Sequence, residues 1–289
     1  MMFQGSLVAL ITPFRKGEVD VATLRELVDW HAGQGTDGLV PVGTTGESPT
    51  VNVAEHEKII KTVVERAAGR LPVVAGTGGN STAEALELTE FARRVGATAT
   101  LQVCPYYNKP TQEGLYRHFA TIAEQVDLPM VLYNVPGRTA VSLAPSTVAR
   151  LAKLENVAAI KEASGSMDQA SEIAGLCDIT ILSGDDSLTL PLMALGAKGV
   201  ISVVANLVPR DVHDMTAAAL KGDFATAGKL HHKLFPLCRA MFFETNPIPV
   251  KTAAGMLGLC EPELRLPLCE MGAEARKRME RAMTDYGLI

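Results

Sequence analysis

The stretch Val157-Ala158-Ala159-Ile160-Lys161-Glu162 places a lysine and a glutamate directly after four apolar residues. A short apolar run of this kind is typical of a strand that is buried on both faces of a parallel sheet. A second stretch, Met130-Val131-Leu132-Tyr133-Asn134, follows the same pattern and ends in a phenol and an amide. We expect both stretches to form buried strands that carry reactive groups at their ends.

Similar apolar stretches recur along the chain and alternate with segments of helical spacing. The predicted strands are residues 7–12, 38–43, 72–77, 98–104, 130–135, 157–163, 180–184 and 199–204. The first helix is expected at residues 21–34, and the second starts after Asn52, where Glu55 completes a capping box. Later helices are expected to begin near Ser81, Thr111, Pro145, Met167, Ser187 and Val208. Eight strand–helix units in 289 residues predict an α/β fold, a closed (β/α)8 TIM barrel.

An open, doubly wound sheet is the alternative architecture. Such a sheet would be expected to carry a glycine-rich dinucleotide loop with the pattern G-x-G-x-x-G after a strand. The chain contains Gly76-Thr77-Gly78-Gly79, which is too short and has the wrong spacing. The barrel is therefore favoured.

The chain continues beyond the eighth unit. Residues 224–243, 250–257 and 274–286 have helical patterns, and Pro247, Pro249, Pro262 and Pro267 interrupt them. We expect a barrel at residues 1–223 and a helical appendix at residues 224–289 that packs on the barrel and adds surface for oligomer contacts.

Composition excludes several classes of protein. The net charge is −5 and no basic run occurs, which argues against a nucleic-acid partner. The N-terminal residues Met1-Met2-Phe3-Gln4-Gly5 lack the features of a signal peptide, and no apolar run approaches the roughly 18 residues of a membrane helix. The five cysteines are scattered and form no C-x-x-C pair, which is typical of reduced thiols. We expect a cytoplasmic protein with no membrane partner.

Lys161 is the strongest candidate for chemistry. Burial disfavours the charged form of a lysine, and a neutral amine beside a phenol is suited to imine formation with a carbonyl substrate. The alternative is a lysine that emerges from the strand end into solvent, which is the commoner arrangement for an isolated lysine. In a barrel the active site forms at the C-terminal ends of the strands, so the polar residues at the other strand ends bear on this choice.

Candidate functional residues follow three of these strand ends. Gly43-Thr44-Thr45-Gly46 could direct N–H groups and hydroxyls at a carboxylate or phosphate, or could be an ordinary capped turn. Arg138 could hold a carboxylate through two hydrogen bonds, or could form a surface ion pair. Two adjacent aromatics, Tyr106 and Tyr107, more often serve packing or an interface.

No metal site is expected. Asp185-Asp186 could hold a divalent cation, but nothing else in the sequence supplies a hard oxygen site, and a solvated or capping pair is the preferred interpretation. His231 and His232 are adjacent on a helix and so face different directions. Cys104 is expected to be a buried strand cysteine.

Taken in order, these motifs resemble the pyruvate-dependent class I aldolase family, also named after N-acetylneuraminate lyase, and most closely its members that use L-aspartate 4-semialdehyde. The matching segments span nearly the whole chain and are Val42-Gly43-Thr44-Thr45-Gly46-Glu47-Ser48, Pro105-Tyr106-Tyr107-Asn108, Leu132-Tyr133-Asn134-Val135-Pro136-Gly137-Arg138-Thr139, Ile160-Lys161-Glu162-Ala163, Leu182-Ser183-Gly184-Asp185-Asp186 and Asn246-Pro247-Ile248-Pro249-Val250-Lys251.

The resemblance implies a role for each residue of the site. Lys161 would form a Schiff base with pyruvate, so no separate cofactor would be needed. Tyr133 would donate and accept the proton. Thr44 and Tyr107 would complete a relay, with Tyr107 reaching into the site of a neighbouring subunit.

The resemblance also implies how the substrates are bound. Thr45 and the main chain of Ile201 would bind pyruvate, and Arg138 would receive the carboxylate of L-aspartate 4-semialdehyde. The assembly would be a homotetramer built as a dimer of dimers. Two alternatives remain open: a sister aldolase that uses a sugar acid, of the N-acetylneuraminate lyase or 2-keto-3-deoxy sugar-acid type, and a non-catalytic barrel that binds a keto acid.

Some family members are inhibited by L-lysine at the dimer interface. The positions that match this allosteric site are Ser48, His56, Asn80, Glu84 and Tyr106. Val53 stands where lysine-sensitive relatives carry a histidine, so the sequence leaves inhibition of this chain open.

Overall fold

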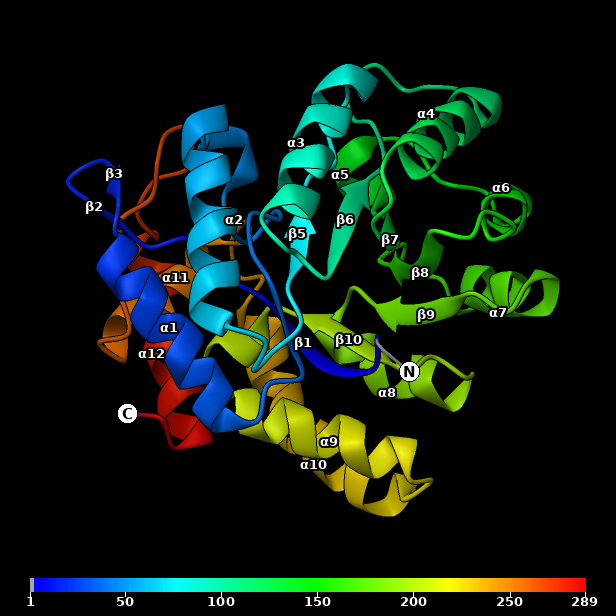
Figure 1. Cartoon of the computed structure of the whole chain (residues 1–289). Coiled ribbons are helices and arrows are strands. Elements are labelled where there is room, and N and C mark those ends of the chain that lie inside the picture. The colour runs from blue at the N-terminus through cyan, green and yellow to red at the C-terminus, as the bar shows by residue number, and fades with distance from the viewer. Residues whose placement is uncertain (1–2) are drawn as a thin grey trace.

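Eight parallel strands pair side by side in the computed structural model, which describes residues 3–289 (Figure 1). The strands are β1 (Gly5–Ala9), β4 (Gly38–Val40), β5 (Val74–Gly76), β6 (Ala99–Val103), β7 (Met130–Asn134), β8 (Val157–Glu162), β9 (Thr180–Ser183) and β10 (Gly199–Ser202). Their order is β4-β1-β10-β9-β8-β7-β6-β5. A parallel bridge between Leu39 and Val73 joins the two ends, and the amide of Leu39 donates to the carbonyl of Pro72 at 2.9 Å. The sheet therefore closes, which confirms the predicted barrel and excludes the open sheet.

Helices surround this barrel, as the alternating pattern predicted. They are α1 (Val21–Gln34), α2 (Val53–Ala67), α3 (Thr82–Arg94), α4 (Gln112–Gln125), α6 (Pro145–Leu151), α7 (Met167–Leu176), α8 (Thr189–Ala194) and α9 (Pro209–Leu220). The capping box that begins α2 is present, because the Asn52 side chain accepts from the amide of Glu55 at 3.0 Å and the Glu55 side chain accepts from the amide of Asn52 at 3.2 Å. This cap fixes where the helix starts.

Several short elements follow strand ends and were not predicted. After β1 the chain forms a hairpin of β2 (Phe14–Arg15) and β3 (Glu18–Val19), and after β7 it forms the one-turn helix α5 (Pro136–Thr139). Three 3-10 turns, η1 (Ser48–Thr50), η2 (Asp186–Leu188) and η3 (Val204–Asn206), lie in the loops after β4, β9 and β10. Elements of two to four residues are too short to show a hydrophobic period.

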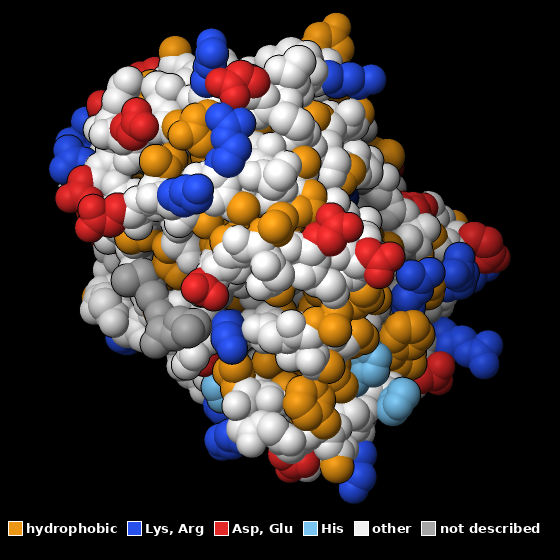
Figure 2. Space-filling model, turned by 90° about the vertical axis from the view of Figure 1, so that its right-hand side faces the viewer, with side chains coloured by type: hydrophobic (Ala, Val, Ile, Leu, Met, Phe, Trp, Pro, Cys, Tyr) orange, Lys and Arg blue, Asp and Glu red, His pale blue; other side chains and the backbone are white. Residues whose placement is uncertain are grey.

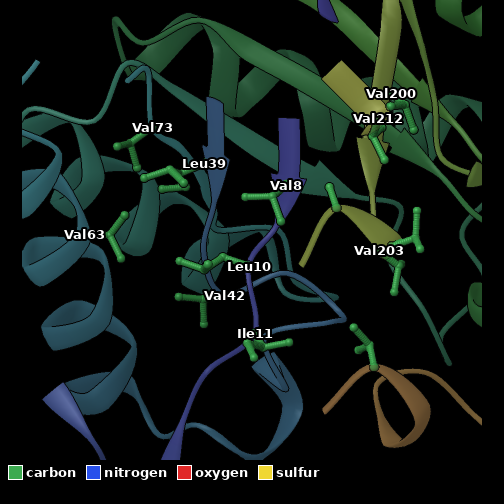
Figure 3. Packing of buried hydrophobic residues seen from close by; sticks show 14 of the residues in the cluster. Val8, Leu10, Ile11, Leu39, Val42, Val63, Val73, Val200, Val203 and Val212 are labelled. Atoms are coloured by element: carbon green, nitrogen blue, oxygen red, sulfur yellow. The ribbon is translucent and has the colours of Figure 1, made fainter. Parts of the chain in front are cut away.

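The core has two layers that follow from the alternation of side chains along each strand. Leu7 and Ala9 belong to the cluster inside the barrel, whereas Val8 between them packs outward against the helices. Figure 3 shows part of the outer layer, in which Val8, Leu39 and Val63 lie between strands and helices. Tyr133 belongs to the inner cluster, so the end of β7 points into the barrel.

Three more helices complete the chain: α10 (Phe224–Ala240), α11 (Ile248–Met256) and α12 (Ala273–Tyr286). Figure 1 shows α10 alongside α9, and α11 and α12 on the same side of the barrel as α1. Leu237, Val250 and Met279 are fully buried and share one apolar cluster with the outer layer of the barrel. Helix α11 starts two residues before the expected position. The boundary between the barrel at residues 1–223 and the helical appendix at residues 224–289 stays a prediction.

The surface carries both signs of charge. On the face seen in Figure 2, lysines and arginines alternate with acidic side chains, and apolar side chains lie in small patches between them. Across residues 3–289, no helix has both the length and the apolar character required to cross a membrane. Met1 and Met2, where the N-terminal segment considered above begins, lie outside the described residues.

Candidate active site

The register between β7 and β8 decides which side chains share the interior of the barrel. Tyr133 pairs with Lys161, and Asn134 pairs with Glu162. Because side chains alternate, the first pair faces inward and the second faces the helices. Lys161 is 5% exposed and Tyr133 is 6% exposed, and the Lys161 Nζ lies 4.2 Å from the centroid of the Tyr133 ring. The interpretation of Lys161 as a solvent-facing lysine is therefore wrong.

Asn134 and Glu162, the pair that faces the helices, fix the ends of β7 and β8. The carboxylate of Glu162 accepts from Asn134 Nδ2 at 3.1 Å, from Gln169 Nε2 at 3.1 Å and from the amide of Ser164 at 2.7 Å. A buried carboxylate with several donors is stable in one geometry. Glu162 thus anchors the strand ends from behind and holds Lys161 and Tyr133 in register, a role that the sequence did not reveal.

Two adjoining cavities lie at the C-terminal ends of the strands. The larger, of about 230 Å³, is lined by residues that include Thr44, Ser48 and Tyr106. The smaller, of about 60 Å³, is lined by residues that include Thr45, Lys161, Asp185, Val203 and Asn246. Thr44, Tyr133 and Arg138 line both cavities. The structure therefore brings Lys161, Tyr133, Thr44, Thr45 and Arg138 to one place, although they come from three strand ends.

The loop after β4 presents its threonines through a tight turn. The amide of Gly46 donates to the carbonyl of Gly43 at 3.0 Å, and the hydroxyl of Thr12 donates to the carbonyl of Gly46 at 2.7 Å. A Cβ on Gly46 would lie 2.9 Å from the backbone nitrogen of Val42, so only glycine fits here. Thr45 is buried, and its hydroxyl oxygen accepts from Asn246 Nδ2 at 3.0 Å. That bond leaves the hydroxyl proton of Thr45 free to donate to an anion.

A buried ion pair ties this loop to the C-terminal helices. Lys251 Nζ lies 2.5 Å from Glu47 Oε1, and both side chains are fully buried. Burial lowers the pKa of Lys251, and the charge of Glu47 opposes that shift. The Lys251 Nζ also lies 4.0 Å from the centroid of the Phe14 ring, and the other oxygen of Glu47 accepts from the amide of Arg265 at 3.2 Å. Both charged residues lay in quoted motifs, but their partnership across 204 positions was not predicted.

Arg138 connects to the same C-terminal segment. It lies in α5, its side chain is exposed, and its Nη2 donates to the carbonyl of Asn246 at 3.1 Å. None of the ion pairs found within residues 3–289 includes Arg138, so the surface ion pair that the sequence left open is not observed. Asn246 therefore contacts the residues that the sequence assigned to two different carboxylates, Thr45 and Arg138.

The acidic pair after β9 divides between two environments. Asp186 is 5% exposed, and its carboxylate accepts from the amides of Val203 and Val204, both at 3.0 Å. Burial raises its pKa. Of the two expected roles, solvated or capping, Asp186 has the capping one, because it accepts from the backbone at the start of η3. Asp185 is half-buried at the smaller cavity. In the part of the chain that the structure describes, no group of three or more His, Cys, Asp and Glu side chains could hold a metal ion.

The two tyrosines of the loop after β6 differ in position, and only Tyr106 reaches a cavity. Tyr107 is 91% exposed, has a φ of 72° and is absent from the lining of either cavity. A positive φ is uncommon for an aromatic residue and indicates a constrained turn. Tyr106 lines the larger cavity, and burial followed by the nearby charge of Glu84 raises its pKa. A single chain therefore does not bring Tyr107 to Tyr133 and Thr44.

Other predicted positions lie below or beside the cavities. Ile201 is fully buried in β10, where it pairs with Leu7. Cys104 is buried, as predicted, and burial raises its pKa to about 12. His56 is also buried, and its Nε2 lies 2.6 Å from the carbonyl of Gly76.

The remaining positions of the predicted allosteric set lie at the rim of the larger cavity or near it. Ser48 lines that cavity, and Asn80 Nδ2 donates to the carbonyl of Tyr106 at 3.2 Å. Glu84 lies exposed in the first turn of α3. Val53 is 46% exposed at the start of α2.

Comparison with known proteins finds relatives that match nearly the whole chain. The model of the dihydrodipicolinate synthetase family matches residues 2–286. The 4-hydroxy-tetrahydrodipicolinate synthase of Pelobacter propionicus is 55% identical over the full length of both chains. The crystal structure of dihydrodipicolinate synthase from Aquifex aeolicus is 54% identical, covers 99% of each chain and has a TM-score of 0.98. The pyruvate complex of the chloride-inhibited enzyme from Acinetobacter baumannii is 46% identical over 99% of each chain, with a TM-score of 0.97.

Proposed function

The chain belongs to the dihydrodipicolinate synthetase family, and from this premise we propose how its residues carry out the reaction of a 4-hydroxy-tetrahydrodipicolinate synthase. The enzyme is a lyase of the diaminopimelate route to L-lysine and condenses pyruvate with L-aspartate 4-semialdehyde. The observation that carries the mechanism is the buried pair of Lys161 and Tyr133 at a cavity that is also lined by Thr45 and Arg138.

Imine formation begins at Lys161. Its neutral amine attacks the ketone carbon of pyruvate, and loss of water leaves a protonated imine. The hydroxyl of Thr45 is oriented by Asn246 and donates to the carboxylate of pyruvate, with a main-chain contact from Ile201. This arrangement places the ketone carbon at the amine before reaction, which lowers the entropic part of the barrier.

Carbon–carbon bond formation follows from the charge of the imine. The cation acidifies the methyl protons of pyruvate, so that loss of one proton gives an enamine. The enamine carbon attacks the aldehyde carbon of the second substrate, whose carboxylate is held by Arg138. The amine of that substrate then attacks the imine carbon and displaces Lys161, and the product leaves as a ring.

Tyr133 carries the protons in these steps, with Thr44 and Tyr107 as the rest of the relay. The exposed position of Tyr107 supports donation to a second subunit rather than to its own site. The tight dimer is then the smallest catalytic unit, and a dimer of dimers makes the homotetramer. Mixing inactive Lys161→Ala with inactive Tyr107→Ala subunits should restore activity, because one site of each mixed dimer carries both residues. Subunit exchange verified by native mass spectrometry, without recovered activity, would exclude this arrangement.

A coupled assay tests the substrate assignment. Pyruvate and L-aspartate 4-semialdehyde should give turnover, whereas pyruvate with N-acetylmannosamine or glyceraldehyde should not. Arg138→Ala should weaken use of the semialdehyde far more than formation of the pyruvate imine. Turnover of a sugar aldehyde instead would identify a sister aldolase, and no turnover of any aldehyde would favour a keto-acid-binding barrel.

A regulatory site for L-lysine is proposed beside the larger cavity. Glu84 could bind an ammonium and Asn80 a carboxylate, with Tyr106 and Ser48 at the rim. His56 is a weaker candidate for contact with L-lysine than the sequence implied, because its side chain is buried and its Nε2 is hydrogen-bonded to the carbonyl of Gly76. Inhibition by L-lysine should weaken in Glu84→Gln and strengthen in Val53→His. Equal inhibition of both variants and the parent would place the inhibitor elsewhere.

A further inference from the structure

Asp185 is held by its backbone at the end of β9. Its amide donates to Ser183 Oγ at 3.2 Å, and its carbonyl accepts from Ser183 Oγ at 2.8 Å and from Thr189 Oγ1 at 3.1 Å. The preceding amide, of Gly184, donates to the carbonyl of Glu162 at 2.7 Å. A Cβ on Gly184 would lie 2.5 Å from the Cβ of Ala163, so the turn packs closely against the end of β8. Asp185 therefore has one fixed position, next to the strand that carries Lys161.

The carboxylate of Asp185 has no hydrogen-bonding role in the described part of the fold. It accepts no hydrogen bond from any residue between 3 and 289, whereas the neighbouring Asp186 accepts two from backbone amides. Asp185 is half-buried and lines the smaller cavity together with Lys161 and Arg138. Burial raises its pKa, and the charge of Lys161 opposes that rise. A carboxylate that is partly desolvated without a donor is unfavourable in the free enzyme and is available to a ligand.

The second substrate presents the charge that this carboxylate lacks. L-Aspartate 4-semialdehyde carries a carboxylate and an ammonium on the same carbon atom, with the aldehyde two carbons further on. Arg138 accounts for the carboxylate, but the ammonium would enter a cavity that is lined by the cationic side chain of Arg138 and by Lys161. Among the described residues that line the two cavities, Asp185 is the only acid. An anion at this point removes the repulsion that the ammonium would otherwise meet.

We propose that Asp185 binds the ammonium group of L-aspartate 4-semialdehyde and thereby selects amino aldehydes over aldehydes that lack the amine. This inference rests on the proposed function, because it assumes that the second substrate is this amino aldehyde. It adds a specificity residue on β9 to the carboxylate binder on α5. An enzyme discriminates strongly between two substrates when its site is built around a charged group that only one of them carries. The aldehyde without the amine would leave the half-buried carboxylate of Asp185 unpaired.

The test compares two aldehydes in Asp185→Asn, which keeps the shape of the side chain and removes its charge. The KM for L-aspartate 4-semialdehyde should rise about 10-fold or more, the usual scale for a lost charged hydrogen bond. The competitive inhibition constant of 4-oxobutanoate, which has the carboxylate and the aldehyde but no amine, should stay within about twofold. Borohydride trapping of pyruvate on Lys161 should also be unchanged. Asp168→Asn, at an exposed aspartate in the first turn of α7, is the matched control and should leave all three readouts unaltered.

Each other outcome is decisive. A similar loss for both aldehydes, or a loss of pyruvate trapping, would mean that Asp185 serves the imine rather than the ammonium, and unchanged constants would mean that it binds neither substrate. Both constants are independent of the active fraction of enzyme, so partial misfolding of the variant does not imitate the expected result. If the parent enzyme fails to condense the semialdehyde at all, the proposed function has failed instead.

Discussion

Replacing Lys251 with methionine should show how far the site depends on the C-terminal helices. Methionine fills a similar volume but leaves the carboxylate of Glu47 buried, with the amide of Arg265 as its remaining donor in the described chain. Breaking one partner of a buried ion pair costs about 3–5 kcal/mol. For a chain of this size such a loss corresponds to a fall in Tm of roughly 6–20 °C.

The Lys251→Met substitution should also lower the catalytic rate. Glu47 directly follows Gly46 and the two threonines of the loop, so a shift of its side chain moves Thr45, the residue proposed to bind pyruvate. A displacement of about 1 Å in a positioning residue can lower rates by ~100-fold, and we expect kcat/KM for pyruvate to fall on that scale. Differential scanning calorimetry and initial rates measure the two effects on one preparation.

The double variant Glu47→Gln, Lys251→Met supplies the critical comparison. Removing both charges should recover most of the lost stability, because the penalty belongs to the uncompensated carboxylate. Lys277→Met, in an exposed pair with Glu274, should change stability by less than about 0.5 kcal/mol. The reasoning is refuted if Lys251→Met behaves like this control, or if the double variant is no more stable than the single one.

Three further predictions concern the proposed catalytic residues and the response to acid. Borohydride reduction with pyruvate should add a stable adduct that peptide mass spectrometry maps to Lys161, and an adduct on another lysine would end that assignment. Tyr133→Phe should lower kcat by ~100-fold, and adding Thr44→Val should cost less than the product of the two single losses, since residues that act as a unit are not additive. His31 is buried beside Thr36, and burial lowers its pKa from 6.5 to about 3, so the folded state excludes a proton that the unfolded state binds. The stability it contributes is complete above pH 6.5 and is lost as the pH falls toward 3, by about 2 kcal/mol at pH 5. His31→Leu should flatten this part of a stability–pH curve measured by urea denaturation, and an unchanged slope would assign the acid sensitivity to other groups.

The barrel could be predicted from the sequence because its strands are local features. Each is a short apolar run with its own period, and the polar residues at the ends of β7 and β8 already indicated where reactive groups lie, though not which face each one takes. The first strand begins at Gly5 rather than residue 7, and the β2–β3 hairpin was missed, because pairings of two residues leave no periodic signal.

The support of the site could not be predicted for a different reason. Glu162, Asp186 and Lys251 are charged residues in otherwise apolar surroundings, and sequence patterns describe such residues as solvent-facing. Their burial depends on partners that lie on other elements. Glu162 accepts a hydrogen bond from Gln169, and Lys251 pairs with the carboxylate of Glu47. Only the folded arrangement shows which partners these charges have, which is why the sequence left Asp186 open between a solvated and a capping role.

The link between Glu47 and Lys251 also sets an order of events during synthesis of the chain. Every strand of the barrel has been made before Lys251 is added, so a nascent barrel holds a glutamate at its rim with no counter-charge and a Thr45 without Asn246. Until the segment from Asn246 to Lys251 has been added, the barrel can have the right topology, but the proposed site lacks these two contacts. A chain that stops before Asn246 would therefore lack both contacts that hold the loop of Thr45 and Glu47.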